Sequence, residues 1–288
     1  KTMGDAMENE EIYTSFPVVD LKGILIPWEK CLKVTIGPIS EILVREMVKK
    51  RYDYAPVFSS DAPNSQLLGL VSRQRLEKLL SENKELAKDD KEIIFAEIPI
   101  RSNLDCILEL FSQEPTRIAS HEYEAEGHTL YNAYGIVNKS DLNRPPIRKI
   151  IYEILAELEM RLAEYIDSKK TDPFALIESL NEDSQARIIG YWELAKRKNA
   201  DTGPLAGAML SELIRIVAKN YYADLGYKSR NEFEKATGQL PEIRNQVMHP
   251  VRPLITDESS CLRLKEALYN AIHLTKKIER KISLTHKD

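Results

Sequence analysis

The sequence predicts a chain in two parts: an α+β first half built from two β-α-β-β-α repeats, and an all-α second half. Three observations lead to this prediction. Short apolar runs alternate with amphipathic stretches up to about Leu142. A double proline, Pro145 and Pro146, then interrupts the pattern. Beyond it, apolar residues recur at helical spacing and no convincing strand follows.

The first repeat extends to about Leu86. The runs GILIPW (23–28) and YAPVF (54–58) are predicted strands, because polar or turn residues bound each of them. A helix is predicted between them over 38–50, and the segment 67–80 reads as a strand that leads into a second helix. The apolar face of the first helix is predicted to contain Ile39, Ile42, Leu43 and Met47.

The second repeat follows the same order more loosely and ends at about Leu142. A strand is predicted within IIFAEIPI (93–100), a helix within NLDCILELF (103–111), and a strand followed by a short helix within LYNAYGIVNKSDL (130–142). Two units of this kind can pack face to face and share one core.

The second half is predicted to be a helical bundle. Prolines are tolerated in the first turn of a helix, so Pro145 and Pro146 can open the amphipathic helix predicted over 147–166. Asp172 and Pro173 predict the N-cap and first residue of another helix. Three further helices are predicted at 183–198, 203–222 and 257–283. The helix at 203–222 is predicted to present one face formed by Met209, Leu210, Leu213, Ile214, Val217 and Tyr221.

The composition is that of a folded protein. The 288 residues are 43% hydrophobic and 30% charged, and the net charge of −4 argues against a general nucleic-acid coat. Residues up to Pro146 include 18 basic and 24 acidic side chains, whereas the remainder includes 23 and 21. The second half is therefore the better candidate for contact with a polyanion.

Three cysteines without CxxC spacing, Cys31, Cys106 and Cys261, argue against a disulfide framework or a zinc site and predict reduced thiols in the cytoplasm. No apolar run approaches the roughly 20 residues that a membrane span needs. The residues before Met7 lack a signal-peptide core and are interpreted as a cloning remnant. The predicted division is an N-terminal extension, 1–20, a first domain, 21–145, and a helical domain, 146–288.

A short pattern occurs in both repeats where a strand ends and a helix begins. It starts with Gly69 in YAPVFSSDAPNSQLLGLVSRQRLEKLL and with Gly135 in YGIVNKSDL. These segments resemble the CBS domain, the cystathionine β-synthase module that occurs in tandem pairs, with its Gly-x-x-Ser/Thr-x-x-Asp pattern. The resemblance covers roughly residues 20–145 and implies a tandem CBS pair.

The CBS resemblance implies a regulatory adenine nucleotide, either AMP- or ATP-like or a cyclic oligonucleotide. In that family the hydroxyl lies near phosphate and the Asp near ribose. Here Ser72 keeps the hydroxyl, while Arg75 replaces the Asp and is expected to hold a phosphate. Asp141 keeps the acid, and Asn138 replaces the hydroxyl and can still form hydrogen bonds. The alternative is that Ser72 and Asp141 only cap the helices that follow them.

A second candidate site lies in LPEIRNQVMHPVRPL, residues 240–254. Asn245 and His249 are four residues apart and share a helical face, so the amide can orient the imidazole. Pro250 disfavours helical geometry at His249, which predicts a helix end there. Arg244, with a polar residue after it and the histidine five positions on, resembles the motif of HEPN ribonucleases. That resemblance covers about residues 147–285.

The HEPN resemblance implies a homodimeric endoribonuclease that cuts RNA without a metal or cofactor, in stress response or phage defence. A histidine can act as general acid or base, and an arginine suits phosphate oxygens, so His249 and Arg244 are given these roles. A two-fold dimer would place two of each around one phosphate. A second Arg-to-His spacing, Arg280 to His286, lacks the polar residue.

Two classes of function remain open. The first is a nucleotide-gated, homodimeric endoribonuclease, in which ligand binding in the first half acts on the helix at 147–166. The second is a catalytically inactive regulatory or dimerisation module, antitoxin-like, in which Arg244 pairs with a carboxylate such as Glu242 and His249 caps a helix. The run HEYEAEGH (121–128) lacks HExxH spacing and is expected to be a solvated hairpin loop rather than a metal site.

Overall fold

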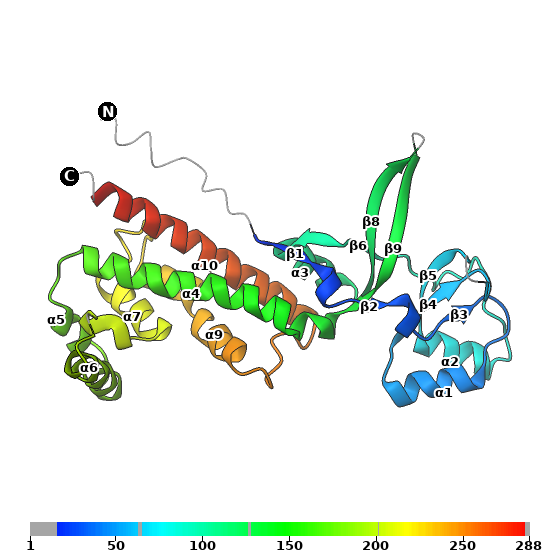
Figure 1. Ribbon diagram of the computed structural model, residues 1–288, viewed down its shortest axis with the longest axis horizontal. Coiled ribbons are helices and arrows are strands. Elements are labelled where there is room, and N and C mark those ends of the chain that lie inside the picture. Colours follow the sequence, from blue (N-terminus) through cyan, green and yellow to red (C-terminus); the bar gives the residue numbers. More distant parts are fainter. Residues whose placement is uncertain (1–15, 63–64, 126–127, 201, 286–288) are drawn as a thin grey trace. The chain divides into compact units, whose positions relative to one another are not determined.

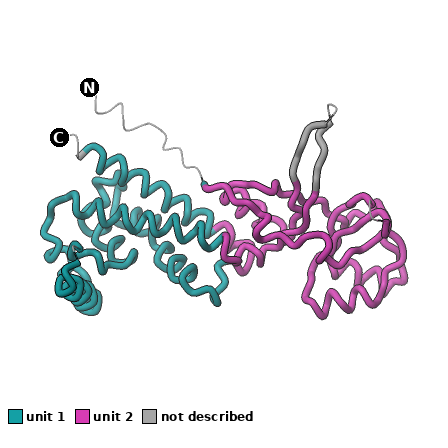
Figure 2. The backbone as a smooth tube through the Cα atoms, viewed as in Figure 1, with its two compact units in different colours: residues 1–16, 147–254, 263–288 teal, residues 17–146, 255–262 magenta. Residues whose placement is uncertain are grey.

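A computed structural model of the chain describes residues 16–62, 65–125, 128–200 and 202–285, with the side chains of 121–132 and Thr285 left out. The chain divides into two compact units, shown in Figure 2. Among the described residues, unit 1 comprises Phe16, 147–254 and 263–285, and unit 2 comprises 17–146 and 255–262. The division at Ile147 lies close to the predicted boundary at 145/146. That 255–262 belongs to unit 2 was not predicted.

The first repeat of unit 2 has the order β-α-β-β-α, but its first strand is not the predicted one. Its three strands form a sheet in the order β3-β4-β5, in which β3 is parallel to β4 and β4 is antiparallel to β5. The elements are β3 (Val34–Thr35), α1 (Glu41–Lys50), β4 (Tyr54–Phe58), β5 (Leu67–Ser72) and α2 (Arg73–Ser81). The helix predicted over 38–50, the strand at 54–58 and the strand-to-helix segment at 67–80 are confirmed. The prediction that 23–28 supplies the first strand is wrong, because β3 takes that place and Ile26–Pro27 pairs with a strand of the second repeat.

One apolar core holds the helices of the first repeat against its sheet. Val44 and Met47 of α1 are buried in it together with Leu76 and Leu79 of α2. The prediction that Ile42 faces this core is wrong, because that side chain is 74% exposed. The helix begins only at Glu41, and Val44 rather than Ile42 points inward with Met47.

The second repeat is longer and recruits the first strands of the chain. It contains β6 (Glu97–Pro99), β7 (Arg101–Asn103), α3 (Leu104–Gln113), β8 (Thr116–Ala125), β9 (His128–Asn138) and a 3-10 turn, η3 (Lys139–Asn143). β1 (Val18–Asp20) pairs with β7, and β2 (Ile26–Pro27) pairs with β9 in a sheet of order β2-β9-β8-β6. β2 is shorter than the predicted strand because the 3-10 turns η1 (Leu21–Gly23) and η2 (Trp28–Lys30) flank it.

The two repeats of unit 2 meet through a small apolar cluster. Leu70 of β5 packs with Ile118 of β8 and Ile136 of β9, and partly buried residues such as Ile26 and Tyr54 surround them. The two repeats therefore share a core, as the sequence predicted.

The regular secondary structure of unit 1 is all helical among its described residues. It is formed by α4 (Pro145–Ser168), α5 (Pro173–Glu178), α6 (Glu182–Arg197), the 3-10 turn η4 (Pro204–Gly207), α7 (Leu210–Asn220), α8 (Arg230–Thr237), α9 (Leu240–Met248) and α10 (Glu258–Thr285), of which α4 and α10 begin in unit 2. The long helices α4 and α10 run side by side (Figure 1), and Arg161 of α4 forms an ion pair of 3.2 Å with Glu279 of α10.

Two details of unit 1 follow from helix capping. Asp172 accepts a hydrogen bond from the backbone of Phe174 and precedes Pro173, which confirms the predicted start of α5. The helix predicted over 203–222 is instead interrupted before Leu210. Buried Glu212 accepts a hydrogen bond of 2.7 Å from the backbone N–H of Met209 and so starts α7 anew, which leaves Met209 46% exposed.

Candidate functional site

Unit 2 contains a cavity of about 670 Å³. Both repeats contribute to its wall, which includes three of the four residues predicted to contact a nucleotide: Ser72, Asn138 and Asp141. Residues from the segment that precedes α10 also line it: Ile255 and Thr256.

The register of the strands makes the two repeats directly comparable. Ser72 lies opposite Tyr54 at the end of the β4–β5 pair. Asn138 lies opposite Thr116 at the end of the β8–β9 pair. Ser72 and Asn138 therefore occupy equivalent positions, and all four residues line the cavity.

The residues that follow Ser72 and Asn138 are both cationic. The backbone N–H of Arg73 donates to the carbonyl of Asp53 at 2.7 Å, and the N–H of Lys139 donates to the carbonyl of Pro115 at 2.8 Å. These two hydrogen bonds are equivalent, so the backbone at Arg73 and the backbone at Lys139 are held in the same way. Arg73 and Lys139 are consequently an equivalent pair of cations on the wall of one cavity.

Gly69 and Gly135, the glycines of the repeated pattern, each allow the backbone of a neighbouring segment to lie close to their strand. A Cβ atom at Gly69, where φ is 144°, would lie 2.8 Å from the carbonyl oxygen of Ile94. A Cβ atom at Gly135 would lie 2.2 Å from the carbonyl oxygen of Ile26. Each glycine lets a neighbouring segment pair with the strand that leads to the cavity.

Ser72, Asn138 and Asp141 also have local structural roles. The hydroxyl of Ser72 accepts a hydrogen bond from the backbone of Arg75 at 3.2 Å and caps α2. Asp141 is buried and accepts a hydrogen bond of 2.9 Å from the backbone of Asn138. The side-chain oxygen of Asn138 accepts from the hydroxyl of Thr116 at 2.8 Å. The capping role considered for Ser72 is present. Asp141 does not cap the residues after it, because it lies within η3 and accepts from the N-cap Asn138 that precedes it. Both residues also line the cavity.

Arg75, the fourth predicted residue, does not line the cavity. Its guanidinium donates to one carboxylate oxygen of Asp90 at 2.7 and 3.2 Å and lies 3.3 Å from Glu92. Burial alone would raise the pKa of Asp90, but the hydrogen bonds from Arg75 and from the backbone of Glu92 lower it overall. Arg75 is thus paired within its own repeat, while sequence reasoning passed over Arg73 and Lys139, each directly after the polar residue of the pattern.

The wall of the cavity has an excess of three positive charges. Five lysines or arginines line it, against two aspartates: Lys30, Lys50, Arg51, Arg73 and Lys139 against Asp53 and Asp141. Both aspartates are already engaged, Asp53 with Arg73 at 3.3 Å and Asp141 with Arg144 at 2.8 Å. The cavity therefore favours an anionic ligand.

Two of the three cysteines, Cys31 and Cys261, are poor nucleophiles. All three are free thiols, and Cys31 lies on the cavity wall. Burial, with a smaller effect of Glu29, raises the pKa of Cys31 to about 11, and burial raises that of Cys261 to about 11. Both thiols therefore stay protonated at neutral pH.

In unit 1, the predicted Arg-Asn-x-x-x-His segment forms the end of α9. The helix ends at Met248, with exposed His249 as its C-cap and Pro250 after it, which confirms the predicted helix end. Asn245 is also exposed. Within the described residues, its hydrogen bond with His249 joins backbone atoms, at 3.2 Å, and does not involve the amide side chain. Arg244 faces Glu159 of α4 at 3.7 Å rather than Glu242.

A buried arginine holds the chain around His249. Arg148 of α4 donates to the carbonyl of Gln246 at 2.7 Å, and it also donates to the carbonyl of Arg252. These carbonyls lie on either side of His249, so Arg148 caps α9 and fixes the turn that follows it. Sequence reasoning did not identify Arg148, which lies 98 residues before Gln246.

Two further expectations concern metals and membranes. The side chains of 121–128 lie outside those described, and among the described residues no group of His, Cys, Asp or Glu is arranged to hold a metal ion. The described helices include none with both the length and the apolar character of a membrane span.

No protein-family model and no curated protein matches the sequence. Solved structures similar to part of it include a hemolysin-like protein containing a CBS domain from Oenococcus oeni PSU, with 13% identity, a TM-score of 0.34, and coverage of 44% of this chain and 88% of that one. A CBS domain-containing protein of unknown function from Bacillus anthracis str. Ames Ancestor has 21% identity, a TM-score of 0.33, and coverage of 47% and 94%. CbpB in complex with c-di-AMP has 12% identity, a TM-score of 0.33, and coverage of 47% and 88%.

Proposed function

We propose that unit 2 is a CBS-like sensor whose cavity binds an anionic nucleotide. The observation that carries this proposal is the cationic wall, which equivalent residues of two repeats build around one cavity. Apolar residues such as Ile26, Leu32 and Ile136 line the same cavity and offer surface for a base. The adenine nucleotide expected from the sequence, mononucleotide or cyclic oligonucleotide, has this combination of apolar base and anionic phosphate.

The proposed phosphate contacts are Arg73 and Lys139. Arg73 replaces Arg75 in this role, because Arg75 is paired with Asp90 away from the wall. Ser72 and Asn138 supply hydrogen bonds at equivalent positions. The ribose contact proposed for Asp141 uses a carboxylate that its own capping bond already orients.

The test is calorimetric titration of the full chain with AMP, ATP and c-di-AMP, with uncharged adenosine for comparison. Arg73→Gln and Lys139→Gln should each weaken binding about tenfold or more, because each removes a charge-assisted contact. Lys78→Gln is the matched control, since Lys78 is exposed on α2 and does not line the cavity. Absence of binding by all three nucleotides, or equal binding by all variants, would overturn the proposal.

A second candidate function, RNA cleavage at His249, is favoured by one observation. His249 is exposed at the end of α9, and Arg148 holds the backbone on either side of it. In this proposal His249 is the general acid or base, and Arg244 leaves Glu159 to contact the scissile phosphate in a homodimer. The weak contact of 3.7 Å between Arg244 and Glu159 makes this exchange inexpensive.

The cleavage test uses labelled RNA with EDTA, with and without adenine nucleotides. Metal-free cleavage that leaves a cyclic phosphate, and that is lost in His249→Ala, supports the enzyme. Light scattering and circular dichroism should show that the variant keeps the fold and oligomeric state of the parent protein. Intact RNA together with bound nucleotide supports the regulatory module instead.

A further inference from the structure

The segment that leads into α10 is attached to the cavity wall. Ile255 and Thr256 line the cavity, although about 110 residues separate them from the rest of unit 2. The amide of Asn143 secures the attachment: it donates to the carbonyl of Ile255 at 2.8 Å and accepts from its N–H at 3.0 Å. A ligand in the cavity would therefore lie beside the start of α10.

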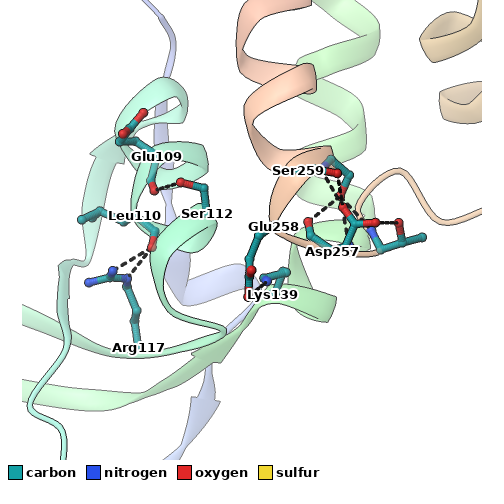
Figure 3. Close-up of polar contacts among 10 residues, drawn as sticks. Glu109, Leu110, Ser112, Arg117, Lys139, Asp257, Glu258 and Ser259 are labelled. Atoms are coloured by element: carbon teal, nitrogen blue, oxygen red, sulfur yellow. Dashed lines mark hydrogen bonds and ion pairs between the residues drawn. The ribbon is translucent and has the colours of Figure 1, made fainter.

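Lys139 connects the cavity to the first residue of that helix. Its ammonium group lies 3.5 Å from a carboxylate oxygen of Glu258. Figure 3 shows this ion pair. The Lys139 side chain is only 13% exposed, whereas that of Glu258 is 64% exposed. Among the described residues, Glu258 is the one carboxylate paired with Lys139. The cation is thus held in place, while its counter-ion is free to move into solvent.

The first turn of α10 has its own cap and does not depend on Glu258 for it. Asp257 accepts a hydrogen bond of 2.7 Å from the backbone N–H of Ser260 and one of 2.8 Å from the hydroxyl of Ser259. Buried Ser260 in turn accepts from the backbone of Asp257 at 3.1 Å. Loss of the Lys139–Glu258 pair would release the turn from the cavity wall without removing this cap.

We propose that Glu258 and the anionic ligand compete for Lys139. Without ligand, Lys139 pairs with Glu258 and holds the first turn of α10 against the cavity. A phosphate forms a shorter, charge-assisted contact with Lys139, displaces Glu258 and frees that turn. The inference rests on the proposed nucleotide function. It adds the element through which ligand binding would act, because α10 begins at this cavity and continues into unit 1. Because coupling is reciprocal, removing the Glu258 contact must strengthen ligand binding.

Titration of ATP into three variants tests the competition. Two of them change Glu258, and the third removes a different carboxylate of α10. Glu258→Gln removes the competing charge and should bind ATP about two- to fivefold more tightly than the parent chain, as expected for a partly exposed ion pair. Glu258→Asp keeps the charge on a shorter side chain that cannot reach Lys139, so direct competition predicts tighter binding here too. A general field effect would instead leave Glu258→Asp like the parent. Glu266→Gln, which removes an exposed carboxylate further along α10, is the control and should bind ATP like the parent.

Hydrogen exchange over residues 256–265 supplies the second readout. ATP should speed exchange of these amides in the parent chain, and Glu258→Gln should already exchange at the faster rate without ATP. If ATP binds but neither Glu258 variant changes affinity or exchange, the competition is refuted and the nucleotide function stands. If ATP, AMP and c-di-AMP all fail to bind the parent chain, the nucleotide function and this inference fall together.

Discussion

The guanidinium of Arg148 donates a hydrogen bond of 2.7 Å to the carbonyl oxygen of Gln246, on a helix 98 residues further along the chain. Helix ends leave carbonyl groups without partners, and a buried cation is a strong way to satisfy them. Here one side chain of α4 closes the end of α9 and also holds the carbonyl of Arg252 beyond it. The exposed imidazole of His249 is thereby presented from a fixed backbone.

Replacement of Arg148 by Gln should lower the free energy of unfolding by about 2–4 kcal/mol. The change removes the buried guanidinium group, so the carbonyls that it contacts lose their hydrogen-bond donor. Chemical denaturation of the full chain measures this loss, and hydrogen exchange should rise over residues 246–252. Arg215→Gln is the control, since Arg215 is exposed on α7. Equal stability of the two variants would contradict the capping role.

Two glycine substitutions are expected to change the stability of the protein in opposite directions. Gly135→Ala should destabilise the protein by about 3 kcal/mol or more, because its Cβ would lie 2.2 Å from a backbone oxygen of β2 that cannot move independently. Gly190→Ala should stabilise it by about 0.5–1 kcal/mol, because Gly190 lies inside α6 and, apart from its chain neighbours and the nearby backbone of its own helix, no atom lies within 4 Å of an added Cβ. Thermal unfolding of both variants gives the comparison.

Substitution of Arg75 should mainly affect the stability of the protein, and substitution of Arg73 should mainly affect ligand binding. Arg75→Gln breaks the pair with Asp90, whose carboxylate side chain is 5% exposed, so it should destabilise the chain by about 1–3 kcal/mol. Its affinity for nucleotide should stay near that of the parent. Arg73→Gln should show the reverse, with a large loss of affinity and a small change in unfolding midpoint. Loss of nucleotide binding in Arg75→Gln, measured at a temperature where it is folded, would restore Arg75 as the phosphate contact.

A pH dependence is expected from Asp224, which accepts hydrogen bonds from Lys169 and Tyr165. Burial alone would raise its pKa, but those hydrogen bonds lower it below the ordinary value of 3.8. The folded state therefore favours the charged carboxylate, which stabilises it above pH 3.8 and ceases to do so as the pH falls through the lower folded pKa. Asp224→Asn should unfold at a lower urea concentration than the parent at pH 7, and the difference should narrow as the pH falls below 3.8.

The matched control for Asp224 is Glu157→Gln, which removes an exposed carboxylate of α4 in the same unit. Its unfolding midpoint should follow that of the parent at both pH values. A gap between Asp224→Asn and the parent that does not narrow at all as the pH falls below 3.8 would show that the carboxylate acts through packing rather than through its charge.

Much of the secondary structure was predictable because its causes are local. YAPVF is β4 from end to end, and the strand-to-helix change after Ser72 occurs where the pattern placed it. The Asp172–Pro173 start of α5 and the end of α9 before Pro250 depend on backbone hydrogen bonds and proline geometry within a few residues. β8 was not predicted, because its charged outer half gives no apolar run.

The candidate sites were predictable only in part. Ser72 and Asn138 line the cavity because strand register carries them to its wall, and Asp141 lines it from the turn η3 that follows Asn138. Arg75 does not, because Asp90, fifteen residues away, offers it a shielded carboxylate. In unit 1, Glu159 pairs with Arg244 in place of the nearby Glu242, since packing of α4 against α9 brings it closer.

By itself, the sequence determined the two-part organisation, the longer helices and the position of the strand ends that form the cavity. These follow from periodicity, capping and proline, which act between neighbours along the chain. Only the tertiary structure decided which charges meet: Arg75 with Asp90, Arg148 with Gln246, and Lys139 with Glu258. Such pairs form because folding brings distant segments together in space. The spacing of residues along the sequence does not indicate which cation will lie next to which oxygen.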